Sequence, residues 1–153
     1  HLARLGHRVL GISNELSEVR EAVSRHESLD VADCSFVVAD VRSLPLRSRF
    51  DVVVSTELLH MLPKKESRLA LKALQALTHQ GGLNAVSGYL VEPGTANDRN
   101  TARMLAPNEL QAAYETAGWQ VIDYVEDYKP LTHTRDGREH VHSTAQIIAQ
   151  RSW

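Results

Sequence analysis

The sequence has little of what secreted and membrane proteins require. Its single cysteine, Cys34, has no partner for an internal disulfide, and one cysteine is typical of a reducing compartment, so the cytoplasm is the expected location. No apolar run approaches the roughly 20 residues that a helix needs to cross a bilayer, and no signal-peptide pattern is present. We therefore expect neither a disulfide framework nor a membrane partner.

Clustered positive charge is also missing. The chain carries 17 lysine and arginine residues and 19 acidic residues, for a formal net charge of −2, and the nearest approach to a basic run is Lys64-Lys65. Because neutralising phosphates requires clustered basic side chains, nucleic acid is not an expected partner. The length of 153 residues suits one hydrophobic core, so residues 1–153 are expected to form a single domain.

The eight glycines form no G-x-G-x-G loop. The chain begins at His1 rather than methionine, and residues 2–6 (LARLG) are typical of the last turn of a helix, which Gly6 closes in the left-handed conformation. A natural domain rarely begins in the final turn of a helix. This start predicts a domain that is incomplete at its amino end.

Strand and helix patterns alternate along the chain, which predicts an α/β fold with a parallel sheet. Short apolar runs predict strands at 8–12, 35–39, 50–55 and 83–90. Helical spacing predicts helices at about 14–28, 67–78 and 107–117. The last two predicted strands, 119–128 and 140–150, have no helix between them, so they predict an antiparallel hairpin.

For three of these elements the sequence also predicts which residues are buried or where the element ends. Residues 50–55 (FDVVVS) are almost continuously apolar, which predicts a central strand buried on both faces. The second helix is expected to stop at Gly81-Gly82 and to bury one stripe, namely Leu69, Ala73, Leu74 and Leu77. The third is expected to begin at Pro107, to end at Gly118 and to bury Leu110, Ala113, Tyr114 and Ala117.

Several short segments resemble those of class I S-adenosylmethionine-dependent methyltransferases, in the same order. They are residues 2–9 (LARLGHRV), Ala39-Asp40-Val41, residues 50–55 with Leu58-Leu59-His60, and residues 78–82 (THQGG). The resemblance implies a Rossmann-like sheet with an antiparallel carboxyl-terminal strand, in the order 3-2-1-4-5-7-6, and S-adenosylmethionine as the cofactor. The first strand of that sheet and the glycine-rich loop after it have no counterpart here.

The carboxyl-terminal part narrows the resemblance to the tellurite-resistance methyltransferase family. The matching words are Gly118-Trp119, residues 124–127 (YVED), residues 132–134 (THT) and Asp136-Gly137. This likeness implies transfer of a methyl group to a small molecule, either a tellurium or selenium oxyanion or a thiol. The family's basic pair is replaced by Thr132-His133, so His133 would contact an anionic substrate in its place.

The class resemblance also implies cofactor-binding residues. Ser13 or Asn14 would face the ribose hydroxyls, Asp40 would accept from the adenine amine, and the backbone N–H of Val41 would meet a ring nitrogen. Ser13 stands where the family has an acid. The alternatives are that Ser13 or Asn14 caps a helix and that Asp40 is an ordinary loop carboxylate.

Near the transferred methyl group, the resemblance places Ser55, Thr56 and His60. No catalytic dyad is expected, because transfer from a sulfonium to a soft nucleophile depends mainly on alignment and desolvation. His140 and His142 have metal-ligand spacing, but no third ligand is evident, so we expect them to face solvent and expect no metal site. The polar stretch Glu92–Arg103 is expected to be a loop that helps to select the acceptor.

A parallel sheet opens its ligand crevice beyond the carboxyl ends of its strands, so Ser13, Asp40 and Ser55 should converge on one adenosine-shaped crevice. Two other interpretations remain. A catalytically inactive nucleotide-binding relative would explain Ser13 in place of the acid. A nicotinamide-dependent oxidoreductase would need an acidic or basic residue at Ser13, and the terminal hairpin and Asp40 favour the methyltransferase.

An incomplete sheet has a physical consequence. In the family the first strand lies between the second and the fourth, so its removal leaves two inner strands with unpaired N–H and C=O groups, which cost about 1–3 kcal/mol each when buried. We expect the isolated 153 residues to bind the cofactor weakly and to unfold without a sharp cooperative transition. Thermal unfolding followed by circular dichroism measures this, and a sharp transition would contradict it.

Overall fold

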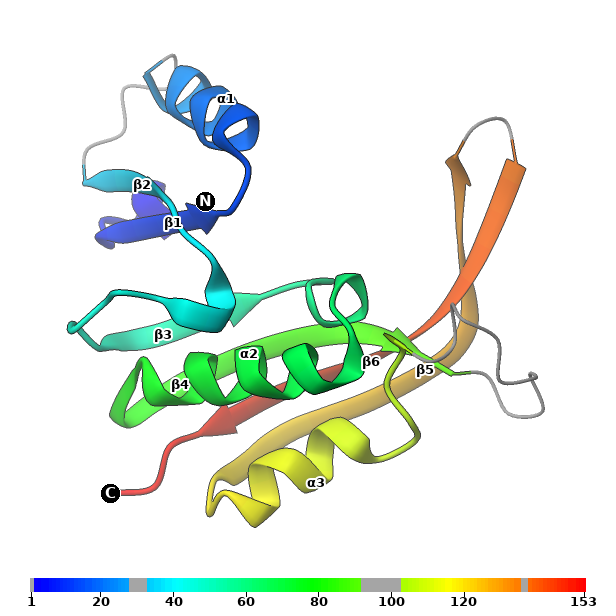
Figure 1. Ribbon diagram of the computed structural model, residues 1–153. Helices are drawn as coiled ribbons and strands as arrows, with labels where there is room; N and C mark the ends of the chain where they lie inside the picture. The colour runs from blue at the N-terminus through cyan, green and yellow to red at the C-terminus, as the bar shows by residue number, and fades with distance from the viewer. Residues whose placement is uncertain (1, 28–32, 92–102, 136–137) are drawn as a thin grey trace. The chain divides into compact units, whose positions relative to one another are not determined.

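The computed structural model describes residues 2–27, 33–91, 103–135 and 138–153, of which 129–135 and 138–141 are described by their backbone alone (Figure 1). The chain divides into two compact units, His1–Pro45 and Leu46–Trp153, and each is described by itself. No helix within the described ranges is both long enough and apolar enough to span a bilayer.

The first unit is a small two-stranded parallel sheet with one α-helix. Strand β1 (Val9–Ser13) pairs with β2 (Cys34–Val38), and α1 (Leu16–Glu27) connects them. Short 3-10 helices, η1 (Leu2–Leu5) and η2 (Val41–Ser43), precede and follow the strands. The predicted β-α-β order is therefore confirmed, and Gly6 has the expected positive φ of 85°. None of the described residues between 2 and 45 is fully buried.

Gly11 is required by close packing within this small sheet. It pairs with Phe36 on the neighbouring strand, and a Cβ at position 11 would lie only 2.6 Å from the Phe36 ring. That separation is shorter than any van der Waals contact between carbon atoms. A side chain at position 11 would therefore displace the largest apolar residue of β2.

The second unit has a four-stranded sheet with helices α2 (Lys64–Ala76) and α3 (Glu109–Thr116). Its strands are β3 (Phe50–Ser55), β4 (Thr78–Leu90), β5 (Gln120–Arg135) and β6 (Arg138–Gln150), in the order β3-β4-β6-β5. A short 3-10 helix, η3 (Leu59–Met61), follows β3. β3 runs parallel to β4, whereas β6 is antiparallel to β4 and to β5. The predicted terminal hairpin is confirmed, and within each unit the strand order agrees with the order that the resemblance implied.

One face of this sheet forms the core, and both helices lie on it (Figure 1). The buried positions alternate along β4 and β6, with Val86 at 2% exposure and Ile147 at 2%, as a sheet covered on one side requires. The prediction that β3 is buried on both faces is wrong. Val52 and Val54 are 48% and 53% exposed, because β3 pairs only with β4 among the described strands and its second face has no helix packed on it within this unit.

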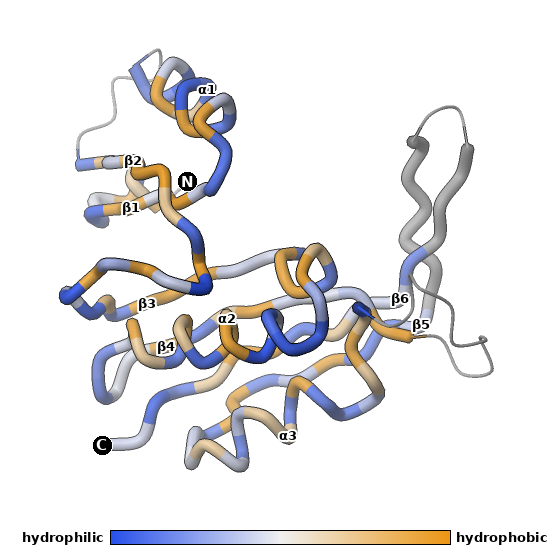
Figure 2. The backbone as a smooth tube through the Cα atoms, viewed as in Figure 1, coloured by the Kyte–Doolittle hydropathy of each residue, from blue (hydrophilic) through white to orange (hydrophobic). Residues whose placement is uncertain are grey.

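The two helices begin and end near the predicted positions, and each buries part of the stripe predicted for it. α2 ends at Ala76 rather than near the two glycines, which lie within β4, and Leu69 is 50% exposed. Leu74 and Leu77 are buried as predicted, together with Ala70 and Leu71. In α3, Leu110 and Tyr114 are fully buried, whereas Ala117 is exposed. Figure 2 shows the mixed polar and apolar faces of α2.

A buried cluster of three hydrogen-bonded side chains joins the two helices to the sheet. The Thr78 hydroxyl lies 3.1 Å from the carbonyl oxygen of Leu74 and also contacts the amide oxygen of Asn84. The Asn84 amide nitrogen donates to the Tyr114 hydroxyl at 3.0 Å. Thr78, Asn84 and Tyr114 are all fully buried, and burial raises the pKa of Tyr114 to about 12. Each partner therefore depends on the others for hydrogen bonds that water cannot replace.

The substitution Tyr114→Phe should destabilise the second unit, because it leaves the buried Asn84 N–H without its acceptor while keeping the ring. We expect a loss of about 1–3 kcal/mol in the free energy of unfolding, measured by urea denaturation. Tyr128→Phe, at a residue that is 41% exposed, is the matched control and should change stability by about 0.5 kcal/mol or less. Equal losses of unfolding free energy in the two variants would contradict a structural role for the hydrogen bond between Asn84 and Tyr114.

Candidate functional site

The carboxyl end of β1 brings Ser13 and a carboxylate together. The Ser13 hydroxyl accepts a hydrogen bond from the backbone N–H of Glu15 at 3.1 Å and donates to Glu18 Oε2 at 2.5 Å. The alternative role of Ser13 in turning the chain into a helix is therefore supported. The same contact fixes the Glu18 carboxylate near the strand end, and Glu18 Oε1 makes no hydrogen bond to a described residue. Asn14 lies beside them and is exposed.

Asp40 follows β2 at the same edge of the small sheet, since Ser13 pairs with Val38 and accepts from the N–H of Ala39 at 2.9 Å. Its carboxylate caps η2, which begins at Val41. Both carboxylate oxygens accept from Arg42: Oδ1 from the backbone N–H at 2.8 Å, and Oδ1 and Oδ2 from Nε at 2.8 and 2.9 Å. These hydrogen bonds lower the pKa of Asp40 to about 2. Asp40 is thus a satisfied carboxylate.

In the second unit, three aromatic rings form a stack at the carboxyl end of β3 and β4. The ring of His60 lies 3.8 Å from that of Tyr89, and the ring of His142 lies 4.3 Å from Tyr89 on the next step of the stack, each pair within 10° of parallel. We call these three residues the ring stack. It joins η3, β4 and β6. His142 is half-buried, so the prediction that it faces solvent is wrong, because the antiparallel register places it beside Tyr89.

Glu57 adds a carboxylate to the ring stack. Its Oε2 accepts from the Tyr89 hydroxyl at 3.4 Å, and burial together with this carboxylate raises the pKa of Tyr89. The backbone of Glu57 has a φ of 56°, in the left-handed region that non-glycine residues seldom adopt. Strained residues of this kind often cluster at functional sites. The chain therefore holds Glu57 at this edge against its intrinsic preference.

The surroundings of His60 favour its neutral form. Burial lowers its pKa, and the nearby His142 acts in the same direction, although the Glu57 carboxylate opposes both. Its Nδ1 atom is buried and, among the described residues, has no hydrogen-bond partner. An unpaired buried polar atom in a native structure calls for an explanation, often a functional one.

The remaining predicted residues are distributed as follows. Ser55 is 8% exposed and points into the core face, whereas Thr56 is exposed. His133 lies in β5 opposite His140 in β6, and their side chains fall outside the described part of the chain. Within the predicted loop Glu92–Arg103, residues 92–102 also lie outside it. Arg103 is described, and its guanidinium donates to the carbonyl oxygen of Met61 at 3.3 Å, next to His60.

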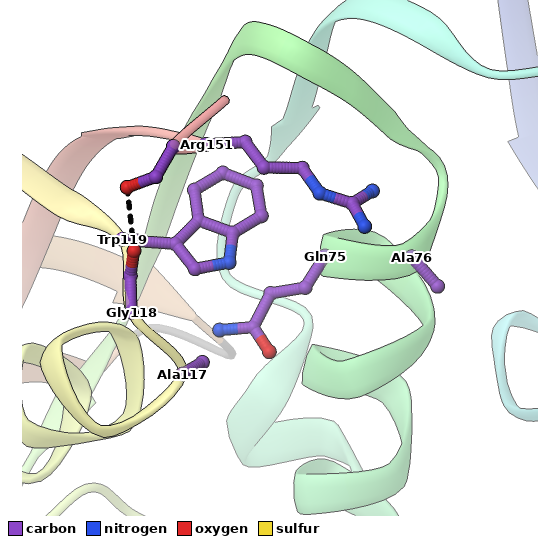
Figure 3. Close-up of a pocket in the computed structure, with 7 residues that line it drawn as sticks. Gln75, Ala76, Ala117, Gly118, Trp119 and Arg151 are labelled. Carbon is purple, nitrogen blue, oxygen red and sulfur yellow. Dashed lines mark hydrogen bonds between the residues drawn. The ribbon is translucent and has the colours of Figure 1, made fainter.

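A separate hollow of about 230 Å³ lies at the other end of the second unit's sheet, where β4 begins and β6 ends. Figure 3 shows the side chains of Gln75, Trp119 and Arg151 around it. The Arg151 guanidinium donates to the carbonyl oxygen of Thr78 at 2.6 Å, and the Ser152 hydroxyl donates to the carbonyl oxygen of Gly118 at 2.6 Å. These contacts hold the residues after β6 against the start of β4 and the segment after α3, and no predicted site residue lines the hollow.

Sequence reasoning missed four residues that the structure places at these edges: Glu18, Glu57, Tyr89 and His142. One signal was readable, because Tyr89 precedes the last residue of a predicted strand, where a parallel sheet presents its ligand-binding edge. Glu18 lies one turn into the helix after Ser13, within reach of a residue at the strand end. His142 became a neighbour of Tyr89 only through the strand register.

The described elements define an α/β chain of the Rossmann-like class. Residues 1–82 match the sequence profile of a family described as methyltransferase domain. Since this match covers more than half of the 153 residues, the chain belongs to the methyltransferase domain family. No curated protein sequence matches the chain.

Solved structures give the same fold. TehB from Haemophilus influenzae has a TM-score of 0.83 at 18% identity, covering 99% of this chain and 52% of TehB, so the chain spans about half of the length of that protein. Magnesium protoporphyrin IX methyltransferase from Synechocystis PCC 6803 with bound SAM has a TM-score of 0.71 at 16% identity, covering 99% and 62%. The [4+2]-cyclase SpnF has a TM-score of 0.73 at 15% identity, covering 95% and 66%.

The pairing of Asp40 with Arg42 makes a titration prediction. In the variant Arg42→Gln the pKa of Asp40 should rise from about 2 toward the ordinary range of aspartate, because the guanidinium hydrogen bonds are lost. In the native chain the stabilisation from Asp40 is present above its unfolded-state pKa and is lost as the pH falls toward about 2.

Carboxyl ¹³C NMR of the native chain and of Arg42→Gln measures the difference. The variant Arg20→Gln, on α1, removes an arginine without touching Asp40 and is the matched control. An Asp40 titration curve that is the same in Arg42→Gln as in the native chain would show that the pairing has no electrostatic effect.

Proposed function

We propose that the chain is part of an S-adenosylmethionine-dependent methyltransferase that acts on a small molecule. The observation that carries the proposal is the match of residues 1–82 to the methyltransferase domain family. The likeness to a methyltransferase structure with bound SAM supports the choice of cofactor. The family match also favours this activity over a nicotinamide-dependent oxidation.

The residues at the end of β1 fit the ribose of such a cofactor. The family's acid is replaced by Ser13, but Ser13 holds the Glu18 carboxylate at this edge through the 2.5 Å hydrogen bond. Two ribose hydroxyls are donors, and Glu18 Oε1 and the Asn14 amide oxygen are acceptors that could meet them. We propose that Glu18, positioned by Ser13, takes the role of the missing acid, with Asn14 beside it.

Binding of the adenine end of the cofactor would require Asp40 to exchange a hydrogen-bond partner. Asp40 would accept from the adenine amine and the N–H of Val41 would meet a ring nitrogen, as the resemblance implies. Both Asp40 oxygens already accept hydrogen bonds from Arg42. Because that pair is exposed, water screens it and displacement of the guanidinium costs little. We propose that Arg42 leaves Asp40 when the cofactor binds.

When bound, S-adenosylmethionine supplies a methyl group on a positively charged sulfur, which leaves as a neutral thioether. The protein contributes alignment of the acceptor and exclusion of water, which are worth up to about 7–11 kcal/mol in well-oriented systems. We propose that Ser55, Thr56 and His60, at the carboxyl end of β3, lie near the transferred methyl group. His133 would contact an anionic acceptor.

We propose that the methyl acceptor is one of those implied by the likeness to the tellurite-resistance family, namely a tellurium or selenium oxyanion, or a thiol. The order of the carboxyl-terminal motifs and the structural likeness to TehB support it. We further propose that residues 1–153 act as one domain, in the cytoplasm, without a nucleic-acid partner. The coverage of 99% of the chain by TehB supports treating the two units as parts of one domain.

A catalytically inactive nucleotide-binding relative is the second candidate. Two observations favour it: the acid expected at position 13 is a serine, and Asp40 is satisfied by its own neighbour. The likeness to a [4+2]-cyclase is consistent with it, because one fold hosts different activities. Such a relative would bind the cofactor weakly or not at all and would transfer no methyl group.

Calorimetric titration of S-adenosylmethionine into the protein expressed from its natural reading frame separates the two candidates. Glu18→Gln should weaken binding roughly tenfold to a hundredfold, because a hydrogen bond to a charged acceptor is worth about 1.5–3 kcal/mol. Ser13→Ala should weaken binding less, since it removes only the group that positions Glu18.

Glu21→Gln is the matched control, because Glu21 also lies on α1 but pairs with Arg25 at 2.5 Å. It should bind the cofactor as the native protein does. Native affinity in Glu18→Gln would refute the ribose assignment alone. Absence of any binding heat in the native protein, together with no methyl transfer to selenite or a thiol, would refute the methyltransferase proposal.

A further inference from the structure

The two ring nitrogens of His60 lie in different environments. Nδ1 is buried and unpartnered among the described residues. Nε2 is not among the buried atoms that lack a partner, and no hydrogen bond joins it to a described residue. His60 as a whole is half-buried. A proton on Nδ1 would therefore meet different surroundings from a proton on Nε2.

The ring stack fixes the plane of this imidazole. Tyr89 lies parallel to His60 at 3.8 Å and is itself backed by His142 at 4.3 Å. Leu59, the residue before His60, is 1% exposed and anchors η3 in the core. The ring thus has contacts on one face and a buried edge, and only small reorientations are open to it.

The position of the proton follows from these surroundings. A buried N–H without an acceptor is rarer in proteins than a buried acceptor without a donor. A neutral imidazole carries one proton, on one of its two nitrogens. The proton is therefore disfavoured on the buried Nδ1 and favoured on Nε2. Protonation of both nitrogens would place an unpaired charged N–H in the buried position, which is more unfavourable still.

We infer that His60 is a neutral hydrogen-bond donor, which offers Nε2–H to an oxygen lone pair of a bound small molecule, and that Tyr89 and His142 are positioning residues for it. In the framework of the proposed function that molecule is the methyl acceptor. A His60 of this kind binds and orients. It does not remove a proton, because Nε2 already carries one.

The charges around the ring stack are compatible with an oxygen ligand. The Glu57 carboxylate opposes an anion, but it is exposed and its Oε2 is shared with the Tyr89 hydroxyl. The Arg103 guanidinium, bound to the carbonyl oxygen of Met61, contributes a positive charge next to His60 in the chain. The two side chains carry opposite charges, so neither sign dominates and the directional N–H sets the preference.

The first test reads the tautomer directly. In ¹⁵N–¹H NMR spectra at pH 7 without cofactor, a nitrogen that bears hydrogen and a bare nitrogen have well-separated ¹⁵N shifts. We expect the proton of His60 on Nε2, and addition of selenite should shift that signal saturably, whereas ethylammonium, which has no lone pair, should not. A proton on Nδ1, a doubly protonated ring, or no response to selenite would overturn the inference.

The second test compares amide replacements at position 60. Glutamine can place its N–H₂ near the position of Nε2, whereas asparagine reaches only the position of Nδ1. His60→Gln should keep selenite affinity within about threefold, while His60→Asn should lose roughly three- to tenfold, the value of one neutral hydrogen bond. Equal losses in the two variants would indicate that the donor at Nε2 does not matter.

Two variants of Tyr89 test whether its ring positions His60. Tyr89→Phe keeps the stacked ring and should leave the His60 tautomer signal and selenite affinity unchanged. Tyr89→Leu removes the ring and should broaden the signal and weaken selenite binding several-fold, with the indole signal of the buried Trp119 as the check that the unit is folded. Because these readouts need no cofactor and no turnover, failure of the methyltransferase proposal would leave them interpretable.

Discussion

The hydrogen bonds of Asn84 hold the second unit together. Its side chain is fully buried between the end of α2 and the face of α3, and it contacts Thr78 on one side and Tyr114 on the other. Apolar contacts are less directional than hydrogen bonds and specify the positions of α2 and α3 on the sheet less strictly. Directional hydrogen bonds in a region without water permit one arrangement. The helix ends, the strand β4 and the edge that carries the ring stack are thereby fixed relative to one another.

With that scaffold fixed, each unit presents chemistry where its parallel strands end. In the first unit the strand ends supply oxygen acceptors, from Glu18 and Asp40. In the second unit they supply aromatic rings and one imidazole N–H. Acceptors suit the hydroxyl and amine donors of a nucleoside, and a neutral ring stack suits a small acceptor molecule. These are the types of side chain that the proposed function requires for the cofactor and for the methyl acceptor.

Much of this arrangement was predictable from local pattern. Strand positions followed from short apolar runs, because a parallel strand must exclude polar residues from its buried positions. The stripe predicted on α2 was partly wrong because two helical faces share apolar residues: the buried one has the spacing i, i+3, i+4 and i+7 and consists of Ser67, Ala70, Leu71 and Leu74. Exposure of Val52 and Val54 could not be anticipated, since the same apolar run serves an edge strand and a central one.

The polar residues at strand ends were also readable, because they adjoin the strands in sequence. Their partners were not. Arg42 turns back onto Asp40 through a 3-10 turn whose geometry composition does not encode, and the neighbourhood of Tyr89 depends on the register that pairs Tyr89 with Thr144. A shift of that register by one residue would place His142 on the opposite face. Long-range register is a property of the whole sheet and leaves no local signature.

The contact between Gly11 and Phe36 constrains how this chain can change over evolutionary time. Position 11 has no room for a methyl group while an aromatic ring lies over it, so it cannot gain a side chain before position 36 changes. A larger residue at position 11 is tolerated only after Phe36 has been replaced by a smaller residue. The intermediate with two small residues then buries less apolar surface, in a unit whose described residues include no fully buried side chain. Substitution at this pair therefore has a fixed order, with position 36 changing before position 11, and it passes through a less stable intermediate.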